Sequence, residues 1–204
     1  MRVPVDPVSE ALGEPDWMPW TPAQVAREMV GLEVPWCVTA GWAVDVYVGR
    51  QTREHEELEV AIPAAGWPGV RRRLSALEFV VAGGGRLWPV EGPAFEEFFQ
   101  TWGRDASGQF RIDVFRDPHV GNTWICRRDA RITRPYSTLI RTTSDGVPFM
   151  APEVMLLFKA KHDRDKDRAD LDVCLTLMTD AEKAWLAHAI TLVHPGHPWL
   201  ATLG

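Results

Sequence analysis

Residues 56–62 read EELEVAI, a stretch in which charged and apolar residues alternate as far as Val60. A period of two is typical of a β-strand, because successive side chains of a strand point to opposite faces. Glu57 and Glu59 are therefore predicted on one face, with Leu58 and Val60 on the other. Two carboxylates on a buried strand face are costly unless a positive charge compensates them. The pattern favours a fold in which this strand meets a cation.

A second alternating stretch, QFRIDVF at residues 109–115, supplies a third carboxylate. It places Asp113 on the face opposite Ile112 and Val114. If the two strands are neighbours, Glu57, Glu59 and Asp113 converge on one patch. Three carboxylates are suited to hold two divalent cations about 3.5–4 Å apart, and magnesium prefers oxygen ligands shared with substrate phosphates. The alternative is that the acids lie on the solvated face of an edge strand.

The residues before the glutamates indicate a phosphate site. VPWCVT, residues 34–39, has the apolar content of a short buried strand, and Gly41–Val48 is expected as a helix that ends near Gly49. The small-residue turn Thr39-Ala40-Gly41 joins them. A helix N-terminus presents free N–H groups and a positive dipole end, so it binds phosphate readily. Strand, turn, helix and acidic strand together predict a site for a triphosphate and its metal.

The rest of the chain divides into an α/β front and a helical back. Residues 1–20 contain four prolines and no periodic apolar face, so an irregular arm is expected there. Short strands and helices are expected through residues 21–150, and residues 93–103 are expected as a short helix or a loop. From Pro152 onward the sequence favours helices. The expected organisation is an arm at 1–20, an α/β domain at 21–150 and a helical C-terminal subdomain at 151–204.

Composition indicates an ordinary globular protein. The chain has 204 residues, of which 46% are hydrophobic and 25% charged. No apolar run approaches the roughly 18 residues of a membrane span, and the acidic, proline-containing N-terminus does not resemble a signal peptide. A net charge of −6 argues weakly against nucleic acid as a partner. Widely spaced cysteines in apolar surroundings are expected to be reduced and buried, in a cytoplasmic protein; they are Cys37, Cys126 and Cys174.

The segment AGWAVDVYVGRQTREHEELEVAI, residues 40–62, resembles the signature of the aminoglycoside 2''-adenylyltransferase-like nucleotidyltransferases. Their superfamily includes lincosamide nucleotidyltransferases and the polymerase-β-type minimal fold. The signature reads Gly-Gly-Trp-Ala, a helix, Gly-Arg-x-Thr-Arg-x-His, then two acids separated by one residue. The residues that match as they stand are Trp42, Ala43, Asp45, Gly49, Arg50, Thr52, Arg53 and His55. Residues 152–175 also resemble the helical segment that follows the catalytic half in that family.

The resemblance implies an α+β protein with the minimal nucleotidyltransferase fold, a mixed sheet flanked by helices, and a helical C-terminal subdomain. It implies Mg²⁺-dependent transfer of a nucleoside monophosphate, such as AMP from ATP, to a hydroxyl of a small molecule such as an aminoglycoside. Glu57 and Glu59 would bind metal, and a third acid, which we match to Asp113, would bind metal or act as general base. The expected ligands are two Mg²⁺ ions, ATP or another nucleoside triphosphate, and the small-molecule acceptor. Neither nucleic acid nor a membrane is expected as a partner.

Two departures from the family pattern bear on activity. Ala40 stands where the family usually has its first glycine, and Glu57 and Glu59 stand where it has an aspartate and then an aspartate or glutamate. Each added methylene moves a carboxylate outward by about 1 Å, and misplacement of that size can cost on the order of 10²-fold in rate. Three interpretations remain open: an active enzyme, a degenerate protein that binds without transfer, and a toxin-type enzyme that modifies proteins.

Several basic and aromatic residues have two interpretations each. Together with Thr39, Ala40 and Gly41, the cations Arg53, Lys159 and Lys161 are expected at the nucleotide phosphates. Arg53 could instead balance Glu57, and the lysines could be merely solvated. His55 could tune the acids or be a hydrogen-bonded core residue. Trp88 and Trp102, on segments expected as loops, could stack on a base or a sugar. An acidic lip for the acceptor, or a solvated face, could be formed by Glu91, Glu96, Glu97 and Asp105. Capping and helix packing are expected of Lys166, Asp167 and Asp170.

Overall fold

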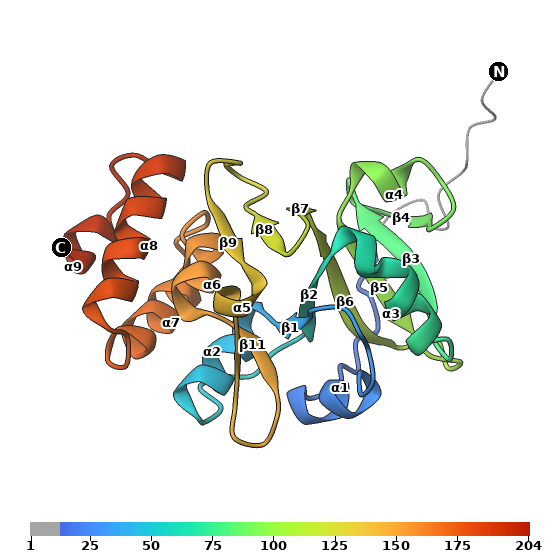
Figure 1. Ribbon diagram of the computed structural model, residues 1–204. Coiled ribbons are helices and arrows are strands. Elements are labelled where there is room, and N and C mark those ends of the chain that lie inside the picture. Colours follow the sequence, from blue (N-terminus) through green and yellow to red (C-terminus); the bar gives the residue numbers. More distant parts are fainter. Residues whose placement is uncertain (1–12) are drawn as a thin grey trace. The chain divides into compact units, whose positions relative to one another are not determined.

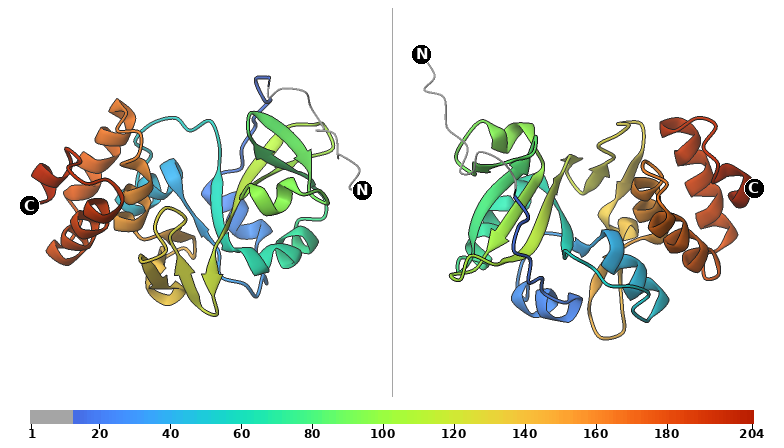
Figure 2. Two further views of the ribbon diagram at one scale, coloured as in Figure 1. Left: turned by 90° about the horizontal axis from the view of Figure 1, so that it is seen from above. Right: turned by 180° about the vertical axis from the view of Figure 1, so that it is seen from behind.

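The structure is a computed structural model that describes residues 13–204, so the first twelve residues of the expected N-terminal arm lie outside the described residues. The chain forms two compact units, and it passes from one to the other three times. Unit 1 contains the described residues of 1–36 together with 56–117, and unit 2 contains 37–55 together with 118–204. Each unit has its own strands and helices, which Figures 1 and 2 show with colours that follow the sequence.

Unit 1 is built on five strands in the order β2-β6-β5-β3-β4, in which β2 and β6 are parallel and the other pairs antiparallel. In Figure 1 these strands run from the teal β2 to the green β4. The elements of unit 1 are α1 (Pro22–Glu28), β2 (Glu59–Pro63), the 3-10 turn η1 (Ala64–Gly66), α3 (Trp67–Arg73), β3 (Glu78–Gly83), β4 (Arg86–Pro89), α4 (Ala94–Glu97), β5 (Gln100–Arg104) and β6 (Phe110–Asp117).

The alternating stretches of the sequence form the two parallel strands. Leu58 and Val60 are fully buried before and within β2, as are Ile112 and Val114 in β6. These side chains belong to the face opposite Asp113, because neighbours along a strand alternate. The predicted strands and their buried face are therefore confirmed, except that Glu57 lies just before the start of β2.

The expectation of a helix or a loop at residues 93–103 is only half correct. The short helix α4 forms, but strand β5 follows it and pairs with both β3 and β6. The sequence QTWGR of β5 shows no regular alternation, and its Gly103 is dictated by packing, since a Cβ there would lie 2.7 Å from Phe79. Trp102 is consequently not on a loop. It is 7% exposed and packs against Trp17 and Phe110.

Unit 2 combines two groups of paired strands with the helices of the C-terminal tail, shown in orange and red in Figure 1. One group has the order β10-β11-β1, with β1 parallel to β11, and the other is a sheet with the antiparallel order β7-β8-β9. The elements of unit 2 are β1 (Cys37–Val38), α2 (Ala40–Val48), β7 (His119–Val120), β8 (Thr123–Ile125), β9 (Thr133–Pro135), α5 (Tyr136–Leu139), β10 (Ile140–Thr142), β11 (Pro148–Met150), α6 (Pro152–Lys159), α7 (Asp165–Leu175), α8 (Asp180–Val193) and α9 (Leu200–Leu203).

Helix α2 is anchored within unit 2. It contacts α6, α7 and β11, and α6 in turn packs against α8. Gly49 ends α2 in the left-handed conformation, with φ of 75°, as a glycine after a helix commonly does. All helices from α6 to α9 follow residue 150, which agrees with the helical character predicted for that part of the sequence. The division into subdomains at that residue stays a prediction.

Side-chain caps stabilise the beginnings of three other helices. Thr21 caps α1 and Thr179 caps α8, each in a capping box with the residue three positions later. The N-cap of α7 is Arg164, whose backbone N–H donates to the Asp167 carboxylate, so Asp167 has the capping role predicted for it. None of the three cysteines forms a disulfide and all three are buried, as predicted.

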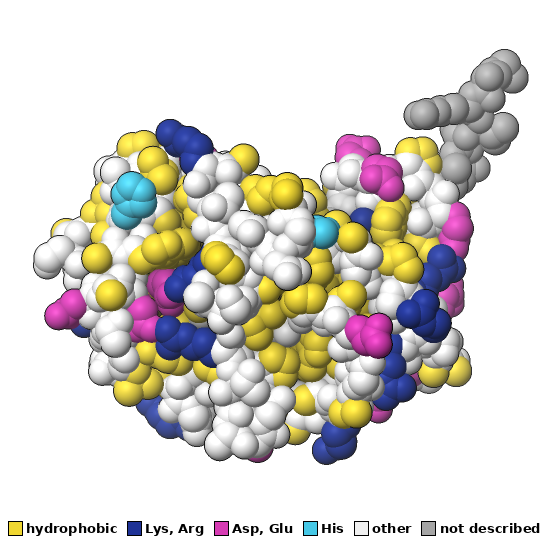
Figure 3. Space-filling view, in the orientation of Figure 1, with side chains coloured by type: hydrophobic (Ala, Val, Ile, Leu, Met, Phe, Trp, Pro, Cys, Tyr) yellow, Lys and Arg dark blue, Asp and Glu magenta, His cyan; other side chains and the backbone are white. Residues whose placement is uncertain are grey.

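The outer surface shows one basic helix. In the space-filling view of Figure 3, dark blue side chains lie over α3, whose last turn carries Arg71, Arg72 and Arg73. No helix among residues 13–204 combines the length and the apolar content that a bilayer crossing requires.

Candidate functional site

Three carboxylates meet at one point of unit 1. One oxygen from each of Glu57, Glu59 and Asp113 lies within 4.8 Å of the other two. The parallel register of β2 and β6 places Glu59 directly beside Asp113, and Glu57 precedes Glu59 by two positions, on the same side. The condition on which the predicted cluster depended, that the two strands are neighbours, is therefore met.

Asp113 is the buried member of this cluster, with an exposed fraction of 0%. The side-chain amide of Gln100, on β5, donates to Asp113 Oδ2 at 2.7 Å. Asp113 Oδ1 and the indole nitrogen of its cross-strand neighbour Trp102 are both buried, and the Trp102 side chain helps to stabilise the charged carboxylate. Burial, followed by the negative charges of Glu59 and Glu57, raises the pKa of Asp113 well above its ordinary value. The charged carboxylate would be stabilised by a cation at this point.

The three carboxylates fit a magnesium site. Mg²⁺ takes oxygen ligands at about 2.0–2.1 Å, so opposite ligands in its octahedron are about 4.2 Å apart. The observed separations of up to 4.8 Å are close to that span. Glu57 lies outside β2, so the ladder of hydrogen bonds restrains its backbone less than that of Glu59. This position of Glu57 gives the longer side chain room to adjust.

The turn Thr39-Ala40-Gly41 in unit 2 leads from β1 into α2. Thr39 makes no side-chain cap on the helix, and its hydroxyl lies 3.3 Å from Met150 Sδ instead. Ala40 has φ of 54°, in the left-handed region that favours glycine. A Cβ on Gly41 would lie 2.4 Å from His55 Nδ1 and 2.6 Å from Arg53 Nη2, so only glycine fits there. The turn is closely covered by the loop that follows α2.

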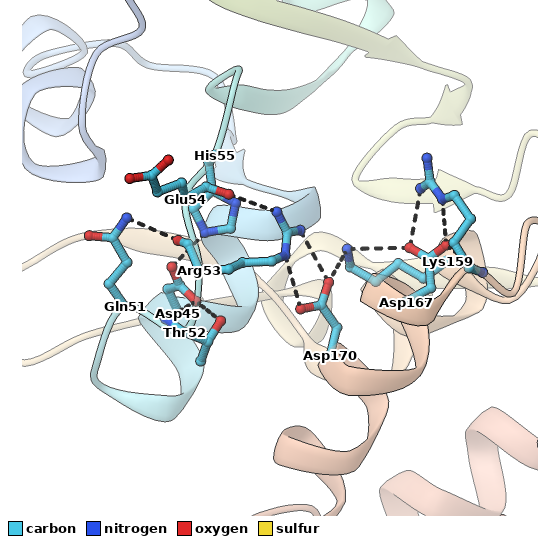
Figure 4. Close-up of polar contacts among 10 residues, drawn as sticks. Asp45, Gln51, Thr52, Arg53, Glu54, His55, Lys159, Asp167 and Asp170 are labelled. Carbon is cyan, nitrogen blue, oxygen red and sulfur yellow. Dashed lines mark hydrogen bonds and ion pairs between the residues drawn. The ribbon is translucent and has the colours of Figure 1, made fainter.

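That loop is held by Asp45, as Figure 4 shows. Asp45 Oδ2 is 2.5 Å from His55 Nε2, while Asp45 Oδ1 accepts from the amide and hydroxyl of Thr52 at 3.0 and 2.5 Å. The His55 ring packs on Trp42, with centroids 4.6 Å apart. Burial lowers the pKa of His55, and the hydrogen bond to Asp45 partly opposes this effect. Four of the matched signature residues, Trp42, Asp45, Thr52 and His55, thus contact one another, and His55 is a hydrogen-bonded core residue.

The predicted cations of unit 2 share one carboxylate. Arg53 donates to Asp170 through Nε at 3.4 Å and Nη2 at 3.2 Å, and Lys159 Nζ lies 2.7 Å from Asp170 Oδ2. Figure 4 shows the side chains of Arg53 and Lys159 converging on Asp170 of α7. Lys161, in the turn after α6, is exposed. The structure therefore brings Arg53 and Lys159 together and leaves Lys161 apart.

The sequence interpretation did not identify Asp170 as a partner of these cations. It assigned Asp167 and Asp170 to capping and packing, and Asp167 does bind the N-terminal turn of α7 through Arg164. Residues three apart share one face of a helix. The i, i+3 spacing of the two aspartates after a lysine-containing helix was the available signal.

Two further groups of candidates have structural partners. Glu91 forms an ion pair with Arg71 at 2.6 Å, and Asp105 forms one with Arg111 at 2.6 Å. The Trp88 indole, on β4 rather than on a loop, donates to the Gly83 carbonyl at 3.0 Å. None of these contacts indicates a ligand.

Comparisons with known proteins give the same family as the sequence motif. The family model Aminoglycoside-2''-adenylyltransferase matches residues 23–92, which include the turn, Arg53 and both glutamates. No curated protein matches the chain over its sequence. The resemblance predicted from residues 40–62 is confirmed by the family match.

Solved structures show which fold the chain has. The lincomycin-bound lincosamide antibiotic adenylyltransferase LnuA is 16% identical, with a TM-score of 0.54 over 76% of this chain and 95% of its own. The complex of ANT(2'')-Ia with adenylyl-2''-tobramycin is 12% identical, with a TM-score of 0.57 over 83% of this chain and 95% of its own. The chain has the nucleotidyltransferase fold, a mixed α/β fold, as predicted.

Proposed function

We infer that this chain, which has the fold and the sequence motif of an antibiotic nucleotidyltransferase, transfers a nucleoside monophosphate from a nucleoside triphosphate to a hydroxyl of a small molecule. The observation that carries this proposal is the convergence of Glu57, Glu59 and Asp113 from two parallel strands. The family match supports nucleotidyl transfer as the reaction class.

In this proposal the three acids hold two Mg²⁺ ions. Such ions, when bound, neutralise charge on the α-phosphate and on the leaving pyrophosphate. Asp113 is suited to two tasks, since Gln100 binds one of its oxygens and leaves the other for a metal or for a proton. A carboxylate whose proton affinity is raised can draw off the proton of the attacking hydroxyl.

The phosphates are assigned to unit 2. The turn Thr39-Ala40-Gly41 leaves the first N–H groups of α2 without a side-chain cap, and helix N-termini favour anions. Arg53 lies against Gly41, and Lys159 lies on the same carboxylate as Arg53. Lys161, which is exposed, is assigned a solvated contact at the outer edge of the phosphates. We propose ATP as the donor. We also propose the cytoplasm as the compartment, because none of the three cysteines forms a disulfide.

We propose an antibiotic hydroxyl as the acceptor. ANT(2'')-Ia and LnuA are described with an adenylylated tobramycin and with lincomycin. The acceptor here is assigned to the same broad class of polar, hydroxyl-bearing antibiotics. The glutamates at positions 57 and 59 are the observation that favours the second candidate, a protein that binds nucleotide without transfer.

The test is a product screen. The full chain is incubated with Mg²⁺ and each of ATP, GTP, CTP and UTP against a panel of aminoglycosides and lincosamides, and products are identified by mass spectrometry. We expect one acceptor to gain a single nucleoside monophosphate, only with Mg²⁺ present. The Asp113→Asn variant serves as the inactive control. Nucleotide binding without any product would contradict transfer and support the binding protein.

A further inference from the structure

We propose that Asp170 is a positioning residue, which holds Arg53 and Lys159 together as one anion-binding pair beside the turn at Gly41. The inference rests on the proposed function, because it concerns how the phosphate-binding residues assigned to unit 2 are held. Its basis is that a single carboxylate on α7 binds both cations, one from the loop after α2 and one from the end of α6.

The side chains of Asp170, Lys159 and Arg53 differ in how far they are buried. The side chain of Asp170 is 2% exposed and that of Lys159 is 9% exposed, whereas that of Arg53 is 27% exposed. The carboxylate and the ammonium are thus fixed inside unit 2, and the guanidinium is the member that a ligand can reach. Long basic side chains adopt many conformations when they are free. Asp170 restricts both of them to one.

Arg53 is held where an anion at the turn would meet it. Its Nη2 atom is 2.6 Å from the position that a Cβ on Gly41 would take. Its Nη1 atom donates to the Glu54 carbonyl at 3.1 Å, which fixes the other side of the guanidinium. Only Nη2 and Nε contact Asp170, at 3.2 and 3.4 Å, and these distances are long for charge-assisted bonds. The Arg53 guanidinium can therefore also interact with a phosphate while it keeps its contacts with Asp170.

Lys159 depends mainly on Asp170. The second carboxylate near it, Asp167, is 4.0 Å from Nζ, against 2.7 Å for Asp170. Asp167 also accepts from the side chain of Arg164 at 2.8 and 3.2 Å, so its charge is already compensated. Two cations and one carboxylate leave the group of Arg53, Lys159 and Asp170 with one net positive charge.

Two roles for Asp170 predict changes of opposite sign in anion affinity when the carboxylate is removed. If the carboxylate only neutralised the cations, its removal would strengthen anion binding, because a negative charge would disappear. If it positions them, its removal would weaken binding although the net charge becomes more positive. The sign of the change separates the two roles.

The experiment measures pyrophosphate binding to the full chain by isothermal calorimetry in EDTA, so that no metal takes part. We expect Asp170→Asn to weaken binding by roughly 10-fold, the size of effect that losing charged hydrogen bonds has. The control is Asp172→Asn, which makes the same charge change at an exposed position of the same helix and should stay within about twofold. Unchanged or tighter binding by Asp170→Asn, or no binding by the natural chain, would overturn the proposal.

A coupling measurement excludes a merely structural effect. Arg53→Ala should weaken pyrophosphate binding by roughly fivefold or more in the natural chain, but by less than about twofold in the Asp170→Asn background, since residues that act together are not additive. Equal effects in both backgrounds would overturn the proposal. If Asp170→Asn does not fold, as judged by circular dichroism, Lys159→Met with Asp170→Leu replaces the buried pair by apolar side chains, which proteins tolerate. Natural affinity in that variant would overturn it as well. Product formation is measured separately, so the proposed transfer can fail while this result stands.

Discussion

Glu59 and Asp113 lie directly beside each other on the parallel strands β2 and β6. Their positions in the sequence are far apart, and the chain between them forms η1, α3, α4 and strands β3 to β5. Parallel neighbours need such a crossover, so the two carboxylates meet only when unit 1 is completely folded. The candidate metal site therefore depends on the fold of unit 1, and the burial of the charged Asp113 carboxylate beside two further carboxylates opposes that fold.

The first prediction concerns that opposition. The raised pKa of Asp113 means that the folded chain binds a proton more readily than the unfolded chain. The stability that this contributes is present below the ordinary pKa, near 3.8, and is lost as pH rises through the higher folded value. Asp113→Asn should therefore stabilise the metal-free protein by about 1–3 kcal/mol at pH 8, the cost of a poorly satisfied buried group.

Urea unfolding in EDTA at pH 4 and pH 8 measures this difference. The gain from Asp113→Asn should be small at pH 4, where the natural side chain approaches its protonated form, and larger at pH 8. A variant that is less stable than the natural chain at pH 8 would show that the carboxylate is already compensated without metal.

The second prediction concerns Ala40. An L-residue in the left-handed region costs roughly 1–2 kcal/mol, and glycine loses about 0.5–1 kcal/mol more chain entropy on folding. Ala40→Gly should therefore stabilise the protein by about 0.5–1 kcal/mol, because φ is 54° at this position. Tm, measured by thermal unfolding, should rise by about 2–4 °C for each kcal/mol of added stability. Nucleotide affinity should be equal or higher, since the backbone can approach the phosphate more closely.

The matched control for this change is Ala184→Gly in α8, an exposed alanine in an ordinary helix interior. It should lower stability by about 1 kcal/mol. If both glycine variants are destabilised alike, the left-handed conformation of Ala40 does not persist in solution. A clear loss of nucleotide affinity in Ala40→Gly would remove this turn from the phosphate site.

The third prediction concerns the reach of the glutamates. Glu57→Asp with Glu59→Asp keeps both charges and shortens both side chains. Since Glu57 lies just before β2 and its backbone is less restrained, we expect the natural spacing to suit glutamate. The double variant should transfer nucleotide at least roughly 10-fold more slowly, as catalytic groups misplaced by about 1 Å do. Initial rates with the acceptor found in the product screen measure this.

Glu54→Asp with Glu56→Asp is the control, because these neighbours are exposed and outside the cluster. A faster double variant at positions 57 and 59 would identify the natural chain as a weakened form of the proposed nucleotidyltransferase. An unchanged rate would mean that neither glutamate binds the catalytic metal.

Much of this site could be predicted from the sequence, because its signals are local. Alternation in residues 56–62 and 109–115 placed Glu57, Glu59 and Asp113 on one side of their strands, and the glycine-containing turn before α2 followed from small residues at a strand–helix junction. The pairing of β2 with β6 does not follow from these local patterns. It depends on packing across the whole of unit 1, which no local pattern contains.

The structure corrected the sequence where tertiary contacts decide. Strand β5 was missed because Gln100, Thr101 and Gly103 do not alternate in polarity, and its partners on both sides impose the extended form. For the same reason, the sequence predicts a loop at Trp102 and gives no indication that Gln100 binds Asp113. The sequence does not reveal the ionic role of Asp170, because its partners come from other elements.

The central claim, that Glu57, Glu59 and Asp113 hold the metal of a nucleotide complex, is tested most directly by thermal unfolding with Mg²⁺ and ATP. A ligand that binds the native state stabilises it by mass action and so raises Tm. At a ligand concentration of a hundred times its Kd, the free energy of unfolding rises by about 2.7 kcal/mol. Mg²⁺ and ATP together should raise Tm of the natural chain and of Glu54→Gln with Glu56→Gln by more than the sum of either alone. In Glu57→Gln with Glu59→Gln, folded as judged by circular dichroism, the two ligands together should give no more than that sum. Full synergy in that variant would contradict the account, because the metal would then be bound elsewhere.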